Sequence, residues 1–102
     1  MELSPMELFQ KEAPEAAAAF NGLIQALIAS EGLDQKTKQL IYIAMKTAMG
    51  DDRAVRAHLP MAKGLGATRE EILDAVLLTL TVSGISGVLK VLPLIVEMYD
   101  EQ

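Results

Sequence analysis

Helix-start signals recur along this chain without any strand pattern, which limits the fold to a set of packed helices. Residues 4–7 (SPME) form a capping box in which proline occupies the first helical position. Residues 68–71 (TREE) form a second capping box. Apolar residues within 14–30 recur at spacings of three and four, and no stretch alternates polar and apolar residues. The sequence therefore predicts an all-α helical bundle of about six helices.

Proline, aspartate and glycine residues mark where the predicted helices begin and end. Asp34 is expected to cap the third helix, and Asp51 or Asp52 to open the fourth, because a carboxylate suits the positive end of a helix. Gly32 is expected to cap the C-terminal end of the second helix. The predicted helices cover residues 5–11, 14–30, 35–49, 52–63, 69–82 and 87–100.

Apolar residues on these helices predict which faces are buried. The third helix is expected to turn five side chains inward: Leu40, Ile41, Ala44, Met45 and Ala48. Three methionines are expected to fill the core: Met45, Met49 and Met61. The last two helices are apolar almost all round and need cover on every side. Between them, Gly84 and Gly87 would allow another backbone to approach closely, although Gly84 could simply end a helix.

The size and the apolar content of the chain together predict self-association. A chain of 102 residues corresponds to a single domain, expected to span residues 1–102. A domain of this size buries only about two thirds of the surface of its unfolded chain. Because 51% of the residues are hydrophobic, a monomer would leave much apolar surface in water. We therefore expect a homo-oligomer.

Charge and cysteine content exclude several classes of function. The net charge of −5 and the lack of a basic cluster argue against nucleic-acid binding. The chain has no cysteine, so disulfides, thiolate metal sites and thiol redox chemistry are excluded. The longest uncharged run, residues 75–89, is shorter than the roughly 20 residues that span a bilayer, so no membrane association is expected. The N-terminus resembles no secretory signal, and a cytoplasmic location is expected.

An ordered set of short motifs resembles a known family. Leu33-Asp34 precedes residues 50–58 (GDDRAVRAH), which are followed by residues 66–72 (GATREEI). In this order and spacing, the motifs resemble the carboxymuconolactone decarboxylase and alkylhydroperoxidase-D-like family. The resemblance covers roughly residues 14–99. It implies an all-helical fold that assembles into trimers or hexamers, with active sites near the subunit contacts.

The resemblance also shows what this chain has lost. Redox members of the family use a glutamate, two cysteines and a histidine as a relay. The corresponding positions hold Gln39, Asp51, Ala54 and His58, so only the histidine remains. Thiol peroxidase activity is therefore not expected. The decarboxylase branch of the family also lacks the cysteine pair and keeps a histidine here, so this chain is closer to that branch.

His58, the only histidine, is the candidate proton carrier, since imidazole exchanges protons near neutral pH. Asp51, Ala54 and His58 share one helix face. Asp51 and His58 lie two turns apart, on the order of 10 Å, so they could bracket a small ligand over Ala54. Gln39 and Tyr42 could donate hydrogen bonds to the ligand. Each of these residues could instead be structural: His58 a packed helix residue, Asp51 a helix-end charge, and Gln39 and Tyr42 packing residues.

Two arginines are further candidates for substrate binding. Arg53 and Arg56 could bind a substrate carboxylate, or they could lie on the solvated face or form subunit salt bridges.

The leading hypothesis is a cofactor-free acid–base enzyme, of decarboxylase or lactone type, that acts on a small carboxylate or lactone. The alternative is a non-catalytic oligomer that binds a ligand or serves as a scaffold. No metal site or cofactor is expected, because one histidine and scattered carboxylates form no ligand set.

Overall fold

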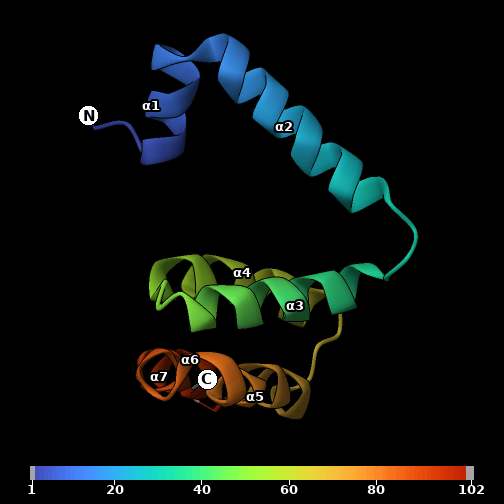
Figure 1. The fold of residues 1–102 in the computed structure, drawn as a ribbon, viewed down its shortest axis with the longest axis vertical. Coiled ribbons are helices and arrows are strands. Elements are labelled where there is room, and N and C mark those ends of the chain that lie inside the picture. The colour runs from blue at the N-terminus through green and yellow to red at the C-terminus, as the bar shows by residue number, and fades with distance from the viewer. Residues whose placement is uncertain (1, 101–102) are drawn as a thin grey trace. The chain divides into compact units, whose positions relative to one another are not determined.

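The computed structural model describes residues 2–100, in which every regular element is an α-helix (Figure 1). The chain forms two compact units, residues 1–32 and residues 33–102. The first contains α1 (Pro5–Glu12) and α2 (Pro14–Ala29). The second contains α3 (Gln35–Ala48), α4 (Asp52–Gly64), α5 (Arg69–Leu78), α6 (Leu80–Ser83) and α7 (Ser86–Tyr99). The predicted all-α fold is confirmed, whereas the single domain over residues 1–102 stays a prediction.

The number of helices differs from the prediction because one predicted helix is interrupted. The expected helix over 69–82 breaks at Thr79, which separates α5 from the four-residue α6. The Thr79 hydroxyl donates a hydrogen bond of 2.7 Å to the carbonyl of Val76, and the Thr79 amide bonds to carbonyls of the same turn. These short-range bonds tighten the last turn of α5 and end it. The other five helices match their predicted bounds to within one residue at each end.

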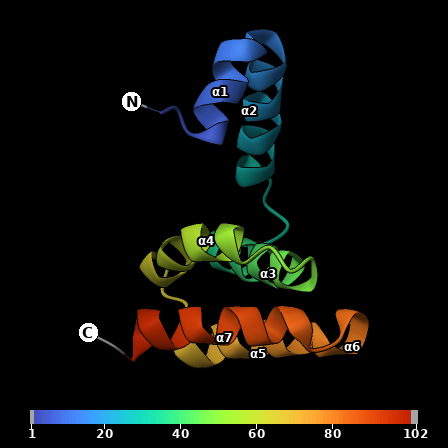
Figure 2. The same ribbon diagram turned by 90° about the vertical axis from the view of Figure 1, so that its left-hand side faces the viewer.

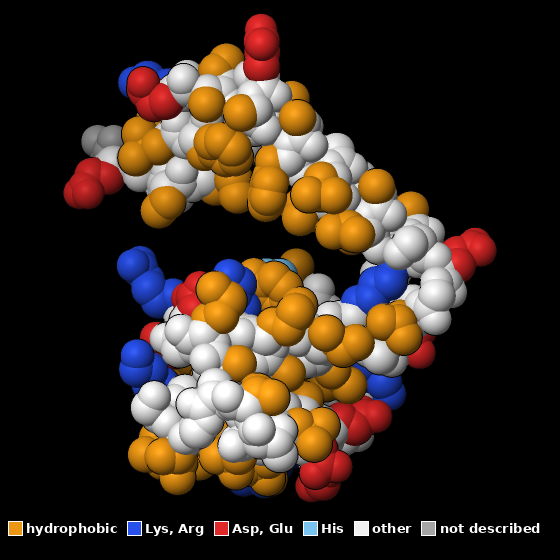
Figure 3. Space-filling view, viewed as in Figure 1, with side chains coloured by type: hydrophobic (Ala, Val, Ile, Leu, Met, Phe, Trp, Pro, Cys, Tyr) orange, Lys and Arg blue, Asp and Glu red, His pale blue; other side chains and the backbone are white. Residues whose placement is uncertain are grey.

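The first unit is a pair of helices joined at Ala13. The predicted capping box opens α1: the Ser4 hydroxyl accepts from the Glu7 amide, and the Glu7 carboxylate accepts from the Ser4 amide. The rings of Phe9 and Phe20 meet edge-on with centroids 6.1 Å apart and connect the two helices. Figure 3 shows apolar side chains gathered along these helices, and most of the large apolar side chains on α2 are exposed.

The prediction that Gly32 caps α2 is wrong. The helix ends at Ala29, and Ser30 is the C-cap residue with extended backbone angles. The amide of Ser30 bonds to the carbonyl of Ala26, and its hydroxyl donates to the carbonyl of Leu27. These bonds pair carbonyl groups of the last turn of α2 two residues before Gly32, so the helix needs no glycine cap.

The second unit has two layers of helices. In two views at right angles, α3 and α4 lie side by side over α5 and α7 (Figures 1 and 2). Apolar side chains from all four helices form one core between the layers. The largest fully buried members of this core are Ile43, Val55, Leu59, Ile72, Val76, Val91 and Ile95. Each layer thus covers the apolar face of the other.

The inner face of α3 differs from the predicted one. Ile43 and Thr47 are fully buried, whereas Ile41 and Met45 are exposed. Thr47 is accommodated because its hydroxyl donates a 2.8 Å hydrogen bond to the carbonyl of Ile43, so its buried oxygen atom is paired. Leu40 packs against the core as predicted, so the buried face of α3 is displaced from Ile41 and Met45 toward Ile43 and Thr47. Met49 and Met61, also predicted to lie in the core, are exposed as well.

The two glycines between α5 and α7 have different tasks. Gly84 has a φ of +79° and ends α6, so the simpler of the two predictions holds for it. Gly87 lies in the first turn of α7, directly against the backbone of α3. A Cβ atom added at Gly87 would overlap the carbonyl of Thr47. The absence of a side chain here lets the two helices approach, as the sequence suggested.

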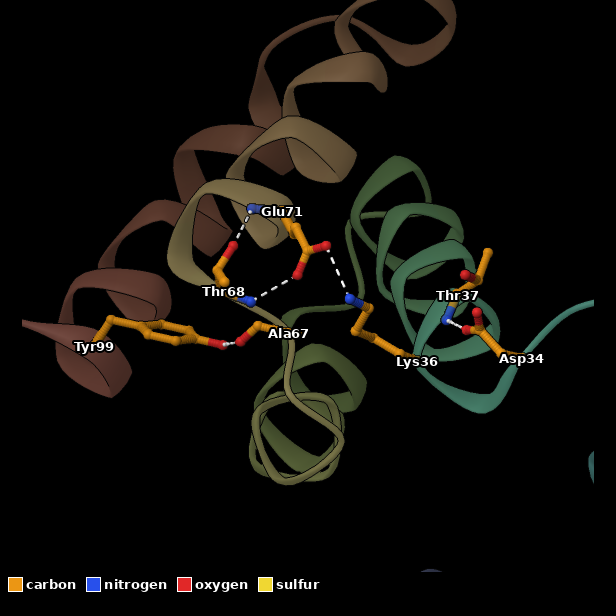
Figure 4. A network of polar contacts seen from close by, with 7 residues as sticks. All are labelled: Asp34, Lys36, Thr37, Ala67, Thr68, Glu71 and Tyr99. Atoms are coloured by element: carbon orange, nitrogen blue, oxygen red, sulfur yellow. Dashed lines mark hydrogen bonds and ion pairs between the residues drawn. The ribbon is translucent and has the colours of Figure 1, made fainter.

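Polar contacts tie the ends of the helices together (Figure 4). The second predicted capping box is present, and its Glu71 also accepts a 3.0 Å bond from Lys36 of α3. The phenol of Tyr99 donates a 2.7 Å bond to the carbonyl of Ala67, just before α5. Burial, with a smaller effect of Glu71, raises the pKa of Tyr99. These bonds hold the start of α5 between α3 and α7.

Within residues 2–100, no helix is both long and apolar enough to cross a membrane.

The close contact at Gly87 gives a first prediction. Gly87→Ala should destabilise the protein by about 3 kcal/mol, because the new methyl group meets backbone that cannot rotate away. Gly22→Ala is the matched control: Gly22 lies inside α2 with no atom near its missing Cβ, so alanine should stabilise by about 0.5–1 kcal/mol. Urea unfolding measures both changes. Equal stability of Gly87→Ala and the wild type would contradict the packing of α7 on α3.

Candidate functional site

A row of half-buried polar side chains follows the seam between α3 and α4. The two helices run antiparallel, since only residues 49–51 separate them. Gln39, Tyr42 and Lys46 occur at spacings of three and four on α3, so they share one face. Asp51, at the start of α4, and His58, inside it, flank that face from the other side of the seam. Residues 19 positions apart in sequence, Gln39 and His58, are thereby brought into contact.

The imidazole of His58 is held at its edge and on its face. Its Nδ1 atom lies 2.9 Å from Oε1 of Gln39, within hydrogen-bond distance. The ring of Tyr42 lies against the imidazole, with centroids 4.0 Å apart and planes inclined by 30°. Both partners come from α3, so packing of α3 on α4 sets the position of the ring. Rotation of the imidazole away from this position would cost both contacts.

Lys46 and Asp51 form the other end of the row. The Lys46 ammonium lies 3.4 Å from Oδ2 of Asp51 and 5.7 Å from the centroid of the Tyr42 ring. The other carboxylate oxygen of Asp51 accepts a 3.1 Å bond from the amide of Ala54 and caps α4. This amide bond, followed by Lys46, lowers the pKa of Asp51. Asp51 is therefore ionised at neutral pH.

The surroundings of His58 favour its neutral form. Burial, and then the positive charge of Lys46, lower its pKa below the ordinary value of 6.5. The ring is only partly buried, so it keeps access to solvent. A neutral imidazole has one nitrogen that carries a proton and one that can accept a proton. In this form, the His58 imidazole can act as a base directly, because one of its nitrogens is already unprotonated.

Comparison with known proteins identifies the family of this chain. The model of the carboxymuconolactone decarboxylase family matches residues 14–97, most of the chain. The chain belongs to the carboxymuconolactone decarboxylase family. A curated relative in Methanocaldococcus jannaschii is described only as an uncharacterized protein. It is 28% identical over 97 residues, which cover 95% of this chain and 91% of that protein. The resemblance inferred from the motifs is therefore confirmed.

In this family member, the structure brings some of the predicted site residues together and leaves others apart. It brings together Gln39, Tyr42 and His58. Asp51 is occupied as the cap of α4 and as the partner of Lys46, the role that the helix-end alternative assigned to it. Ala54 is half-buried on the same helix, one turn before His58. The substrate-binding roles predicted for these residues stay predictions.

Two arginines considered from the sequence lie elsewhere. Arg53 and Arg56 are exposed, and the Arg56 guanidinium lies 3.5 Å from the Glu97 carboxylate of α7. Lys46 was not predicted from the sequence. The signal was present, because Lys46 lies four residues after Tyr42 and seven after Gln39, on the same helix face.

Two hollows on the surface of the second unit lie away from the histidine. One, of about 330 Å³, is lined by Arg56, Leu59, Leu94, Glu97 and Met98. A second, of about 280 Å³, is lined by Asp74, Leu77, Leu78 and Thr81. Neither includes His58, Gln39 or Tyr42. Within the described part of the chain, no three His, Asp or Glu side chains cluster as metal ligands.

The electrostatics of this site give a second prediction. Since Lys46 acts on His58 through its charge, Lys46→Gln should raise the pKa of His58, while burial keeps it below the ordinary value. Loss of the partner of Asp51 acts in the same direction. An NMR titration of the single histidine measures the change. Lys90→Gln, which removes a cation that contacts Gly50, is the control and should leave the pKa unchanged. An equal shift in both variants would contradict a specific effect of Lys46.

Proposed function

We propose that this family member is a cofactor-free acid–base enzyme, of decarboxylase or lactone type, that acts on a small carboxylate or lactone. His58 is the proposed proton carrier. The observation that carries the proposal is the half-buried imidazole, 2.9 Å from Oε1 of Gln39 and packed on the Tyr42 ring, in surroundings that lower its pKa. A structural histidine needs no such combination of a fixed orientation, a lowered pKa and access to solvent.

The chemistry follows from the protonation state. In the lactone reaction, the neutral imidazole accepts a proton from the water molecule that attacks the carbonyl carbon, and the imidazolium then gives this proton to the oxygen that leaves as the ring opens. In the decarboxylation, the electron pair of the broken bond to carbon dioxide moves into the substrate's own carbonyl group and forms an enolate. The enolate carbon then takes a proton from the imidazolium, which has obtained it from water. The reaction therefore requires a substrate that contains its own electron sink.

The neighbouring residues have proposed roles in binding. The Lys46 ammonium lies 5.7 Å from the centroid of the Tyr42 ring, and it would attract a substrate carboxylate while Asp51 keeps it in place. Ala54 leaves space beside the seam because its side chain is short. Tyr42 offers a ring face and a phenol to the ligand. Gln39, Tyr42, Asp51 and Ala54 are thus the proposed surroundings of the ligand.

The third prediction tests the proton carrier. His58→Asn should lower turnover by at least about 100-fold, because asparagine keeps polarity and lacks a titratable nitrogen. Acetoacetate, followed by release of carbon dioxide, and γ-butyrolactone, followed by ring opening, are the probes. Arg56→Gln is the control, since Arg56 lies on the exposed side of the same helix and should be dispensable.

Each outcome of this assay has a clear meaning. Full turnover by His58→Asn would contradict the role of His58. If the wild type turns over neither probe and its His58 titration responds to neither, the enzymatic proposal fails for both substrate classes. Circular dichroism of each variant separates loss of activity from loss of fold.

A non-catalytic role is the second candidate, and two observations favour it. The position of the relay glutamate is held by Gln39, and the two hollows described above do not include His58. A protein of this kind would bind a small ligand, or only copies of itself, along the seam. Turnover separates the two candidates: a ligand-binding protein would shift the titration of His58 without converting the ligand, and a scaffold would show neither effect.

We also propose that the chain assembles into a homotrimer or homohexamer. The support is the number of apolar side chains left in water, among them Leu78, which is 67% exposed, and Val82, which is 80% exposed. Light scattering should give a mass of three or six chains. A monomeric mass at micromolar concentration would contradict this fourth prediction.

A further inference from the structure

The contact between Gln39 and His58 specifies more than the position of the ring. The atom of Gln39 that faces the imidazole is Oε1, which can only accept a hydrogen bond, 2.9 Å from Nδ1. A bond between the two atoms therefore requires the proton to be on Nδ1. In a neutral imidazole, the other nitrogen, Nε2, is then left with a free electron pair. That nitrogen lies on the edge of the ring away from Gln39.

We propose that Gln39 is a positioning residue that holds His58 in the tautomer with the proton on Nδ1, which makes Nε2 the atom that exchanges protons with a ligand. The chemical consequence rests on the proposed function, whereas the tautomer itself does not. This role differs from the substrate-binding role predicted from the sequence, because the amide oxygen is directed at the histidine.

The ring contact with Tyr42 supports this assignment. Which ring nitrogen of a histidine carries the proton is set by the hydrogen bond that it makes, so an acceptor fixed at Nδ1 selects the tautomer with the proton there. Tyr42 lies against the face of the imidazole and restricts rotation of the ring, which would carry Nδ1 away from Gln39. Both residues lie on α3, three positions apart, and so act on the ring from one rigid helix. The acceptor is therefore built into the fold.

The neutral charge of the amide has its own effect. A carboxylate at position 39 would also accept from Nδ1, but it would favour the imidazolium, because a hydrogen bond between charged partners is stronger. The amide orients the ring without this preference for the charged form. Gln39 thus fixes the tautomer and leaves the base neutral.

The charged groups around the histidine are consistent with a neutral resting state. Lys46 of α3 acts on the imidazole, and Asp51 of α4 partly compensates its charge. The other helix packed on α4 is α7, whose Glu97 is paired with Arg56 and whose Lys90 bonds to the carbonyl of Gly50. In the wild type, α3 therefore supplies both the neutral acceptor at Nδ1, which is Gln39, and the nearby cation, which is Lys46.

The test reads the tautomer directly. Long-range proton–nitrogen NMR of the full-length protein, labelled with nitrogen-15 and kept above the pKa of His58, distinguishes a protonated from an unprotonated ring nitrogen. We expect a protonated Nδ1 and an unprotonated Nε2 in the wild type. The opposite pattern would overturn the proposal, since the amide would then present its NH₂ group to Nδ1. This measurement requires no variant and so cannot fail through misfolding.

Two substitutions test Gln39 itself. Gln39→Leu removes the acceptor at similar volume and should shift the tautomer toward a proton on Nε2. Gln39→Glu should keep the proton on Nδ1 and raise the pKa of His58 by roughly one unit or more. Gln10→Glu makes the same chemical change at an exposed position of α1 and should alter neither quantity. An unchanged tautomer in Gln39→Leu would overturn the proposal.

Activity separates this inference from the proposed function. If the wild type turns over acetoacetate or γ-butyrolactone, Gln39→Leu should lower kcat, and Gln39→Glu should move the acid limb of the pH profile to higher pH. Turnover and pH profiles that match the wild type in both variants would overturn the positioning role while the enzyme assignment stands. If the predicted tautomer is found and neither probe is turned over, the proposed function fails and the role of Gln39 in fixing the tautomer stands.

Discussion

The contact of α7 with the backbone of α3 determines how the second unit is arranged. Gly87 packs on the carbonyl of Thr47, which places Thr47 and Ile43 of α3 toward the core. Once these two residues point inward, helical geometry places Gln39, Tyr42 and Lys46 on the flank of α3 that follows the seam with α4. The histidine on α4 meets its partners because the core has fixed the rotation of α3. Packing and chemistry are therefore linked through one helix.

Local signals in the sequence were sufficient for the elements. The capping boxes at Ser4 and Thr68 form as predicted, because each depends only on residues within one turn. The errors occurred where contacts distant in sequence decide. Thr47 was not assigned to the core, since its burial depends on a bond to Ile43 and on the approach of Gly87. The break at Thr79 is a local effect of its hydroxyl, which an apolar pattern does not reveal.

The site could be predicted in part. His58 was selected as the only histidine within a recognisable motif, and that selection needed no knowledge of the fold. Its bond to Gln39 spans 19 positions and two helices, so no spacing rule could reveal it. Lys46 was missed because its effect on the imidazole depends on where α3 and α4 meet. The sequence pattern did not predict how α3 is rotated about its own axis, and this rotation decides which of its side chains face α4.

The uncharged partner of His58 has a consequence at the level of the gene. Glutamine and glutamate codons differ only in their first base, so one point mutation can exchange the amide at position 39 for a carboxylate of nearly the same shape. Such a mutation would leave the packing of α3 and α4 intact and change which form of the imidazole is favoured. An ancestral and a descendant protein could therefore differ in their resting protonation state while their folds remain superimposable.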